Sequence, residues 1–172
     1  GDVFRITGMP ASAGASLSLF LEESTITTSA AGARILDAAW NGPLTAVVAE
    51  NTLTGTASMN SLVRIDNASA TEMTNVTVET NFFNLHDDGF GIDLSAAGPS
   101  ELSIESNTFD LQGADGTGMR FLLAGSADVN LASNLLLDEG SAGTGVLFTS
   151  IADGSELNLE NNLFDFNSSS GA

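Results

Sequence analysis

The chain has 172 residues, 42% of them hydrophobic, which is enough apolar material for one domain with a sizeable core. Four basic residues, all arginine, and 22 acidic residues give a net charge of −18, and this argues against nucleic acid as a partner because phosphate binding relies on lysine and arginine. The lack of cysteine excludes disulfides and thiolate metal sites, and no apolar run approaches the roughly 18 residues of a membrane-spanning helix, so membrane insertion is not expected.

A ten-residue pattern recurs six times along the chain. LSIESNTFDL at 102–111 shows it: apolar residues stand five and three places before a polar anchor, Asn107, and another stands two places after it. The anchors are Ser24, Asn51, Asn81, Asn107, Asn134 and Asn162, separated by 27, 30, 26, 27 and 28 residues. A period this steady indicates a repeat architecture.

In chain order, each period predicts three strands. Alternating apolar and polar residues predict a strand before each anchor and a short strand after it. A further alternating run follows about 10 to 13 residues beyond the anchor. These runs are Val3–Ile6, Ala33–Ile35, Val63–Ile65, Phe90–Ile92, Met119–Phe121 and Val146–Phe148. Segments rich in Gly, Asp, Asn and Ser separate the runs and predict turns.

A coil in which each strand pairs with the equivalent strand one turn away accounts for a pattern that repeats at this interval. We therefore predict an all-β fold, a single parallel β-helix domain over residues 1–172 with about six turns of 27–29 residues, either whole or as a segment of a longer solenoid. A β-sandwich also has short strands and glycine-rich turns, but it gives no reason for the period.

The step from strand through Asn to an apolar residue, as in SNTFDL at 106–111, ENNLFDF at 160–166 and TNFFNL at 80–85, resembles the parallel β-helix repeat of pectin-lyase-like proteins, exported bacterial adhesins and autotransporter passengers. The resemblance spans essentially the whole chain and implies a right-handed coil with three sheets. It also implies a ladder of stacked, hydrogen-bonded asparagines. Its members would be Asn51, Asn81, Asn107, Asn134 and Asn162. Because this fold carries enzymes and fibres alike, the resemblance assigns no activity.

The arginines fall at one predicted position, the outward residue of the run that follows the anchor. They are Arg5, Arg34, Arg64 and Arg120, with Gly91 and Leu147 at this position in the other repeats. The pattern predicts a basic interaction stripe along one sheet. Because like charges on neighbouring strands repel, we expect the stripe to be offset by acids such as Asp66 and Asp93, or by the acidic surface of a partner.

The main enzymatic alternative is a polysaccharide lyase or glycoside hydrolase that acts through acidic turns. Hydrolysis needs two carboxylates on neighbouring turns, and the candidates are Asp87, Asp88 and Asp115, close to His86. The Gly-His-Gly and Arg-x-Lys elements of β-helical polygalacturonases are absent from the sequence. We therefore assign no catalytic residue and predict that the chain is not an enzyme.

Calcium binding is a weaker alternative for the same turns, because Ca²⁺ takes hard oxygen ligands. The candidate ligands are Asp87, Asp88, Asp115, Asp138 and Glu139. Neither an EF-hand loop nor a calcium-binding nonapeptide repeat is present, so no cofactor is predicted and calcium stays a candidate only.

Composition and predicted fold together favour a non-enzymatic, extracellular or cell-surface protein with a structural or adhesive role. No amphipathic capping segment is evident at either end of the predicted coil, and uncapped solenoid ends promote association. We expect self-association end to end or laterally, in a filament, surface layer or adhesin. A cell-surface or polysaccharide partner is the alternative to self-association.

Overall fold

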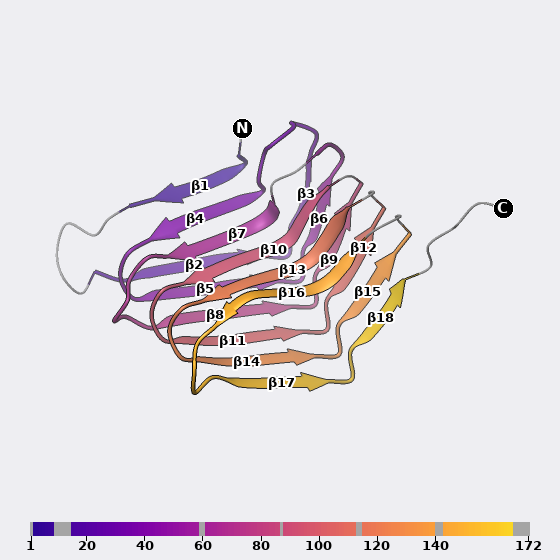
Figure 1. The fold of residues 1–172 in the computed structure, drawn as a ribbon. Coiled ribbons are helices and arrows are strands. Elements are labelled where there is room, and N and C mark those ends of the chain that lie inside the picture. The colour runs from indigo at the N-terminus through magenta and orange to yellow at the C-terminus, as the bar shows by residue number, and fades with distance from the viewer. Residues whose placement is uncertain are drawn as a thin grey trace.

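The computed structural model describes residues 2–8, 15–58, 61–86, 88–112, 115–139 and 143–166. These residues form 18 strands and no helix, and the strands lie in three parallel sheets of six strands each. The chain winds from one sheet to the next as a continuous coil (Figure 1). The predicted all-β parallel β-helix with three sheets is confirmed. This part of the chain accordingly contains no helix that could span a membrane.

Each sheet takes one strand from every repeat. Sheet A consists of β1 (Phe4–Thr7), β4 (Leu36–Trp40), β7 (Ser61–Asn67), β10 (Gly89–Ala96), β13 (Gly116–Leu123) and β16 (Thr144–Ile151). Sheet B consists of β2 (Leu17–Glu22), β5 (Leu44–Ala49), β8 (Thr74–Glu79), β11 (Ser100–Glu105), β14 (Ala127–Ala132) and β17 (Glu156–Glu160). Sheet C consists of β3 (Thr25–Thr28), β6 (Thr52–Gly55), β9 (Phe82–Leu85), β12 (Thr108–Leu111), β15 (Leu135–Asp138) and β18 (Leu163–Phe166).

The coil makes about five turns rather than the predicted six. Six strands in a sheet are separated by only five one-turn steps in the described residues, whereas the prediction counted one full turn for every repeat.

Parallel pairing places equivalent side chains in columns that fill the interior. Leu102 pairs with Val76 on one side and Val129 on the other, and all three are buried. Phe83 pairs with Phe109, and their rings stack with centroids 4.7 Å apart and 4° between the planes. Because stacked coils repeat the same cross-section, each buried side chain packs on one of similar shape above and below it.

Glycines of sheet A make room for the large side chains of sheet C. Gly91, Gly118 and Gly145 occupy equivalent positions of β10, β13 and β16. A Cβ on Gly91 would lie 2.8 Å from Phe109 Cδ1, and a Cβ on Gly118 would collide with Leu136 Cδ1. These glycines therefore face the core. The prediction that Gly91 takes an outward position is wrong, because Gly91 and the next residue, Ile92, are both buried, and Gly91 faces the Phe109 ring.

Candidate interaction surfaces

The five predicted asparagines form one continuous hydrogen-bonded column at the turn between sheets B and C. Asn81 shows the pattern: its backbone N and its Nδ2 both donate to Asn107 Oδ1, at 3.0 and 2.9 Å, and Nδ2 also donates to the Val48 carbonyl at 2.8 Å. The same two bonds join Asn51 to Asn81, Asn107 to Asn134, and Asn134 to Asn162. This column satisfies amides that would otherwise be buried without partners.

The residue before each anchor adopts a left-handed backbone conformation. These residues are Glu23, Glu50, Thr80, Ser106, Ser133 and Asn161, with φ between 49° and 57°. Non-glycine residues adopt this conformation at a cost, and the repeated hydrogen bonds of the column offset it. The turn that carries the column is therefore the same in every coil.

The outward residues of sheet A form a column of alternating charge, which differs from the predicted stripe. In register order it reads Arg5, Asp37, Arg64, Asp93, Arg120 and Leu147. Arg34 precedes β4 and does not belong to the column, so the prediction that all four arginines share one position is wrong for Arg34. The number of residues between each anchor and its column member would have located the column. This number is 13 for Asp37, Arg64, Arg120 and Leu147, and 12 for Asp93.

Asp37, which the sequence interpretation missed, is the centre of the charge network. It is 1% exposed, and Arg64 Nη1 donates to its Oδ1 at 3.0 Å. Arg5 Nε and Arg34 Nη1 both lie 3.6 Å from its Oδ2. Arg34 lies just before β4 and joins the network through Asp37, which is three residues further along the same coil.

Arg64 bridges two carboxylates, Asp37 and Asp66, at 3.0 and 2.5 Å. Burial alone would lower the pKa of Arg64, but its hydrogen bond to Asp37 and the carboxylates of Asp66, Asp37 and Asp93 outweigh burial and raise that pKa above its usual value. Stabilisation from a raised pKa is present below the usual value and is lost only above it. Arg64 therefore stays charged at every pH at which the protein would be assayed.

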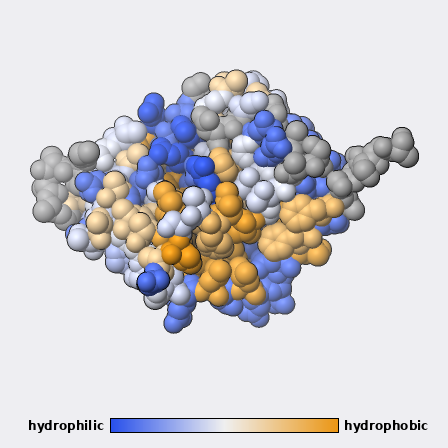
Figure 2. Space-filling view, viewed as in Figure 1, coloured by the Kyte–Doolittle hydropathy of each residue, from blue (hydrophilic) through white to orange (hydrophobic). Residues whose placement is uncertain are grey.

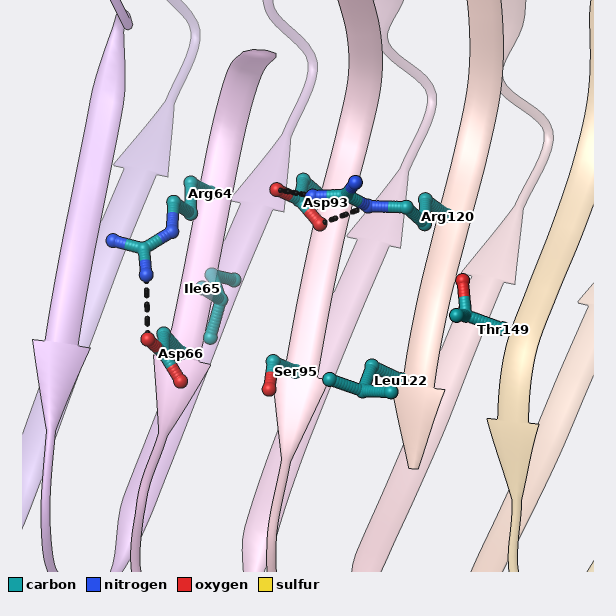
Figure 3. A pocket seen from close by; sticks show the side chains of 8 residues that line it. All are labelled: Arg64, Ile65, Asp66, Asp93, Ser95, Arg120, Leu122 and Thr149. Atoms are coloured by element: carbon teal, nitrogen blue, oxygen red, sulfur yellow. Dashed lines mark hydrogen bonds and ion pairs between the residues drawn. The ribbon is translucent and has the colours of Figure 1, made fainter. Parts of the chain in front are cut away.

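A hollow of about 300 Å³ opens beside this network on the outer face of sheet A (Figure 3). Arg120 makes a two-pronged contact with Asp93, at 2.8 and 2.6 Å, and its guanidinium lies 4.0 Å from the centroid of the Phe90 ring. Ser95, Leu122 and Thr149 complete the wall together with Arg64, Ile65 and Asp66. Planar pairing and ring stacking fix Arg120 in one orientation.

The outer face of sheet A is electrically balanced, whereas the rest of the chain is acidic. The four arginines contact four aspartates, Asp2, Asp37, Asp66 and Asp93. Subtracting four from 22 leaves 18 acidic residues with no basic residue elsewhere in the sequence. The expected offset of arginine by Asp66 and Asp93 is observed, but the sheet presents paired charges rather than a positive stripe.

Replacing Asp37 with asparagine is expected to lower the free energy of unfolding by about 2–3 kcal/mol. The change leaves three guanidinium groups beside one another without their shared counter-charge, and the cost stays below that of a fully buried pair because Arg64 is partly exposed. Urea titration followed by circular dichroism measures it. Asp93→Asn removes the ion pair of Arg120 and leaves the ion pairs of the other three arginines in place, so it is the matched control and is expected to cost about 1 kcal/mol. Equal losses in the two variants would contradict the central role of Asp37.

In the described residues, the last coil exposes apolar side chains that stand at the end of the core columns. Leu157, Leu159, Phe164 and Phe166 are 43%, 59%, 39% and 47% exposed. They line a hollow of about 430 Å³ together with Gly145, Val146 and Phe148. Figure 2 shows the resulting apolar patch in orange, over the C-terminal strands β16 to β18. The sequence interpretation did not identify these residues.

The structure describes most of the acidic turn residues on which the enzymatic and calcium alternatives depend. Asp87 lies outside the described residues, and His86 is exposed. Asp88 Oδ1 accepts a bond from the backbone N of Asp115 at 3.3 Å, which ties successive turns together. Asp138 is 4% exposed and accepts from the backbone N of Gly143 at 3.0 Å. Glu139 is exposed.

The side chains of Asp88 and Asp138 therefore hold the backbone of their turns. In these residues, no group of three or more His, Asp or Glu side chains converges as metal ligands. The candidate ligand sets at the turns stay predictions without an observed cluster.

No protein-family model, curated protein or solved structure matches the chain. The fold and the two surfaces described above are thus the basis for assigning a role.

Proposed function

We propose that the chain is a non-enzymatic structural or adhesive β-solenoid, a subunit or segment of an extracellular or cell-surface filament, surface layer or adhesin. In this proposal the coil is right-handed, of the exported adhesin type that the repeat resembles. The single observation that carries the proposal is the exposed apolar surface that Leu157, Leu159, Phe164 and Phe166 form on the last described coil. The coil supplies a rigid rod, and its end supplies the contact.

An exposed solenoid end combines two features that promote association. The outer edges of β16, β17 and β18 have no following strand in the sheets of the described residues. Such edges offer backbone groups for pairing with another strand. Removing the apolar hollow beside them from water stabilises the contact by roughly 25 cal/mol per Å² of apolar surface buried. Both gains are realised when another coil covers the end.

The outer face of sheet A is the proposed lateral contact. Two acidic rods repel each other through most of their surfaces, but not through a face on which four arginines pair with four aspartates. A neutral cell-surface polysaccharide would meet the same balanced surface. This face thus supports the proposed assembly and surface attachment.

The variant Leu159→Asp is expected to weaken self-association at least tenfold, because it places a charge in the apolar end. Analytical ultracentrifugation over a concentration series measures the association, and electron microscopy shows whether the assemblies are filaments. Leu159 is more than half exposed, so the coil itself is expected to stay folded by circular dichroism.

Met73→Asp is the matched control, since Met73 is an apolar residue with 38% exposure in the turn before β8, away from the end. It is expected to leave association unchanged. A wild-type chain that stays monomeric at high concentration, or equal weakening in both variants, would contradict the proposed function.

A further inference from the structure

Two hollows adjoin on the outer face of sheet A. One is the hollow of about 300 Å³ beside Arg120 (Figure 3), and the other, of about 360 Å³, lies beside Trp40. Asp66 lines both hollows, so they meet at this residue. The outward residues paired with Asp66 on the neighbouring strands are small, Ala39 and Ser95. Together the two hollows form one groove that runs across the strands from β4 to β16 (the cross-strand groove).

The charge network fixes the carboxylate in the middle of the cross-strand groove. The buried Asp37 holds Arg64, and Arg64 Nη2 in turn donates to Asp66 Oδ2 at 2.5 Å. Within the described residues, Asp66 Oδ1 accepts no hydrogen bond. A side chain that is already held through one oxygen loses little freedom when its other oxygen binds a ligand. Asp66 therefore offers the groove a preorganised acceptor.

Arg120 offers a fixed donor in the same groove. Its Nε and Nη2 donate to Asp93, and its guanidinium packs on the Phe90 ring, which leaves Nη1 without an acceptor in the described part of the chain. The hydroxyls of Ser95 and Thr149 also line the groove and make no hydrogen bond to described residues. Ligand hydroxyl groups match such a surface, because each of them can both donate and accept.

A β-bulge brings Thr149 into the wall of the groove. On β13 and β16, Phe121 pairs with Phe148 and Leu122 pairs with Ser150, so Thr149 is an extra residue without a partner in the register. Bulges bend a strand and redirect a side chain, and they are frequent beside binding sites. The irregular register of β16 thus lies where the groove needs a polar side chain.

Trp40 forms an aromatic wall at the other side of Asp66. It is partly exposed at the end of β4, and Asn41 and Thr7 line the hollow with it. An indole ring presents a broad, flat apolar surface. The C–H face of a sugar ring packs on such a surface while its hydroxyls bond to the polar groups around it. An aromatic wall beside an amide, a hydroxyl and a carboxylate therefore fits a sugar ring.

The charges of the groove favour a neutral ligand. Each guanidinium that lines it is already paired, Arg64 with Asp66 and Arg120 with Asp93. An anion would have to displace one of these carboxylates, and it would approach a chain of net charge −18. A cation would meet the guanidinium groups themselves. Hydroxyl groups need no counter-charge and leave both ion pairs in place.

We propose that the cross-strand groove binds a neutral glycan that lies extended across the strands of sheet A. This inference deepens the proposed function, on which the role of the bound glycan rests, by naming the partner of the adhesive surface. From β4 to β16 there are four strand steps, or about 19 Å, which accommodates about four sugar units. One sugar ring packs on Trp40, and hydroxyls of the following units bond to Asp66 and Arg120.

Tryptophan fluorescence tests the groove directly, because Trp40 is the only tryptophan and the chain has no tyrosine. The probes are neutral tetrasaccharides of glucose, xylose, mannose and galactose, with tetragalacturonate as the anionic comparison. At least one neutral probe is expected to change the emission of Trp40 saturably and to protect it from acrylamide quenching, whereas tetragalacturonate is expected to do neither. No response to any neutral probe, or an equal response to tetragalacturonate, overturns the inference.

Ser95→Phe places a ring in the groove at a half-buried outward position and leaves Trp40 as the reporter. It is expected to weaken binding at least about tenfold. Ser103→Phe, the same change at a half-buried outward position of β11 in sheet B, is the matched control and is expected to bind as the wild type does. Asn41→Ala, at an exposed position that cannot disturb the core, is expected to weaken binding about fivefold. Equal binding by all three variants would contradict the assignment of the groove.

Sedimentation of the same samples separates this inference from the proposed function. The titrations are made at a dilution at which the chain sediments as a monomer, because a lateral contact through sheet A would cover the groove. Self-association without binding of any neutral probe overturns the glycan groove and leaves the proposed assembly standing. Binding by a chain that stays monomeric at high concentration overturns the assembly and supports the groove.

Discussion

Asn107→Leu is expected to lower the free energy of unfolding by about 3–5 kcal/mol. The substitution removes the acceptor of two bonds from Asn81 and the donor to the buried Val78 carbonyl. A buried polar group without a partner costs about 1–3 kcal/mol, and several arise here at once. Leucine is also unable to hold the turn that Ser106 enters with φ of 57°. Urea denaturation followed by circular dichroism measures the loss.

The matched control for the ladder is Asn75→Leu. Asn75 takes an outward position on β8 and is partly exposed, so the same chemical change there is expected to alter stability by no more than about 0.5 kcal/mol. Similar losses from Asn107→Leu and Asn75→Leu would show that the column contributes nothing beyond ordinary surface bonding. A loss confined to Asn107→Leu would identify the column as a main stabilising element of the coil.

Phe109→Ala is expected to cost about 3–5 kcal/mol for a different reason. Phe109 is fully buried and stacks on Phe83, and it faces Gly91, which has no side chain that could move into the space left behind. The loss therefore includes both the transfer of the ring from water and a cavity that stays open. Thermal or urea unfolding measures the effect.

Phe82→Ala supplies the comparison, because Phe82 precedes Phe83 on β9 but points outward and is 37% exposed. Its removal is expected to cost less than about 1 kcal/mol. If both phenylalanine substitutions had the same effect, the close packing between the glycines of sheet A and the rings of sheet C would not determine stability.

The asparagine column was predictable from the sequence because the coil repeats. Anchors such as Asn81, Asn107 and Asn134 recur at nearly constant spacing, and parallel pairing of successive coils converts that spacing into vertical stacking. The alternation around each anchor also indicates which side chains enter the core. No long-range information is needed for either step.

The charge network shows where that reasoning stops. Arg34 stands 10 residues after its anchor and Arg64 stands 13 after its own, so turn length, rather than residue type, decides which residue of one coil lies beside which residue of the next. The sequence interpretation aligned the arginines by type and therefore placed Arg34 beside Arg64. The structure places Asp37 there, and the expected positive stripe becomes a neutral face.

By itself, the sequence determined the fold class, the period of the coil and the anchor ladder, because each depends on local alternation repeated at a constant interval. It also determined the acidity of the chain, which depends on composition alone. Only the tertiary structure decided the pairing of Arg64 with Asp37, the glycine faces that receive Phe109 and Leu136, and the exposure of Leu159 at the open end. These features depend on the register between coils and on which surfaces a coil leaves uncovered. Both arise when turns of different length bring strands together in space.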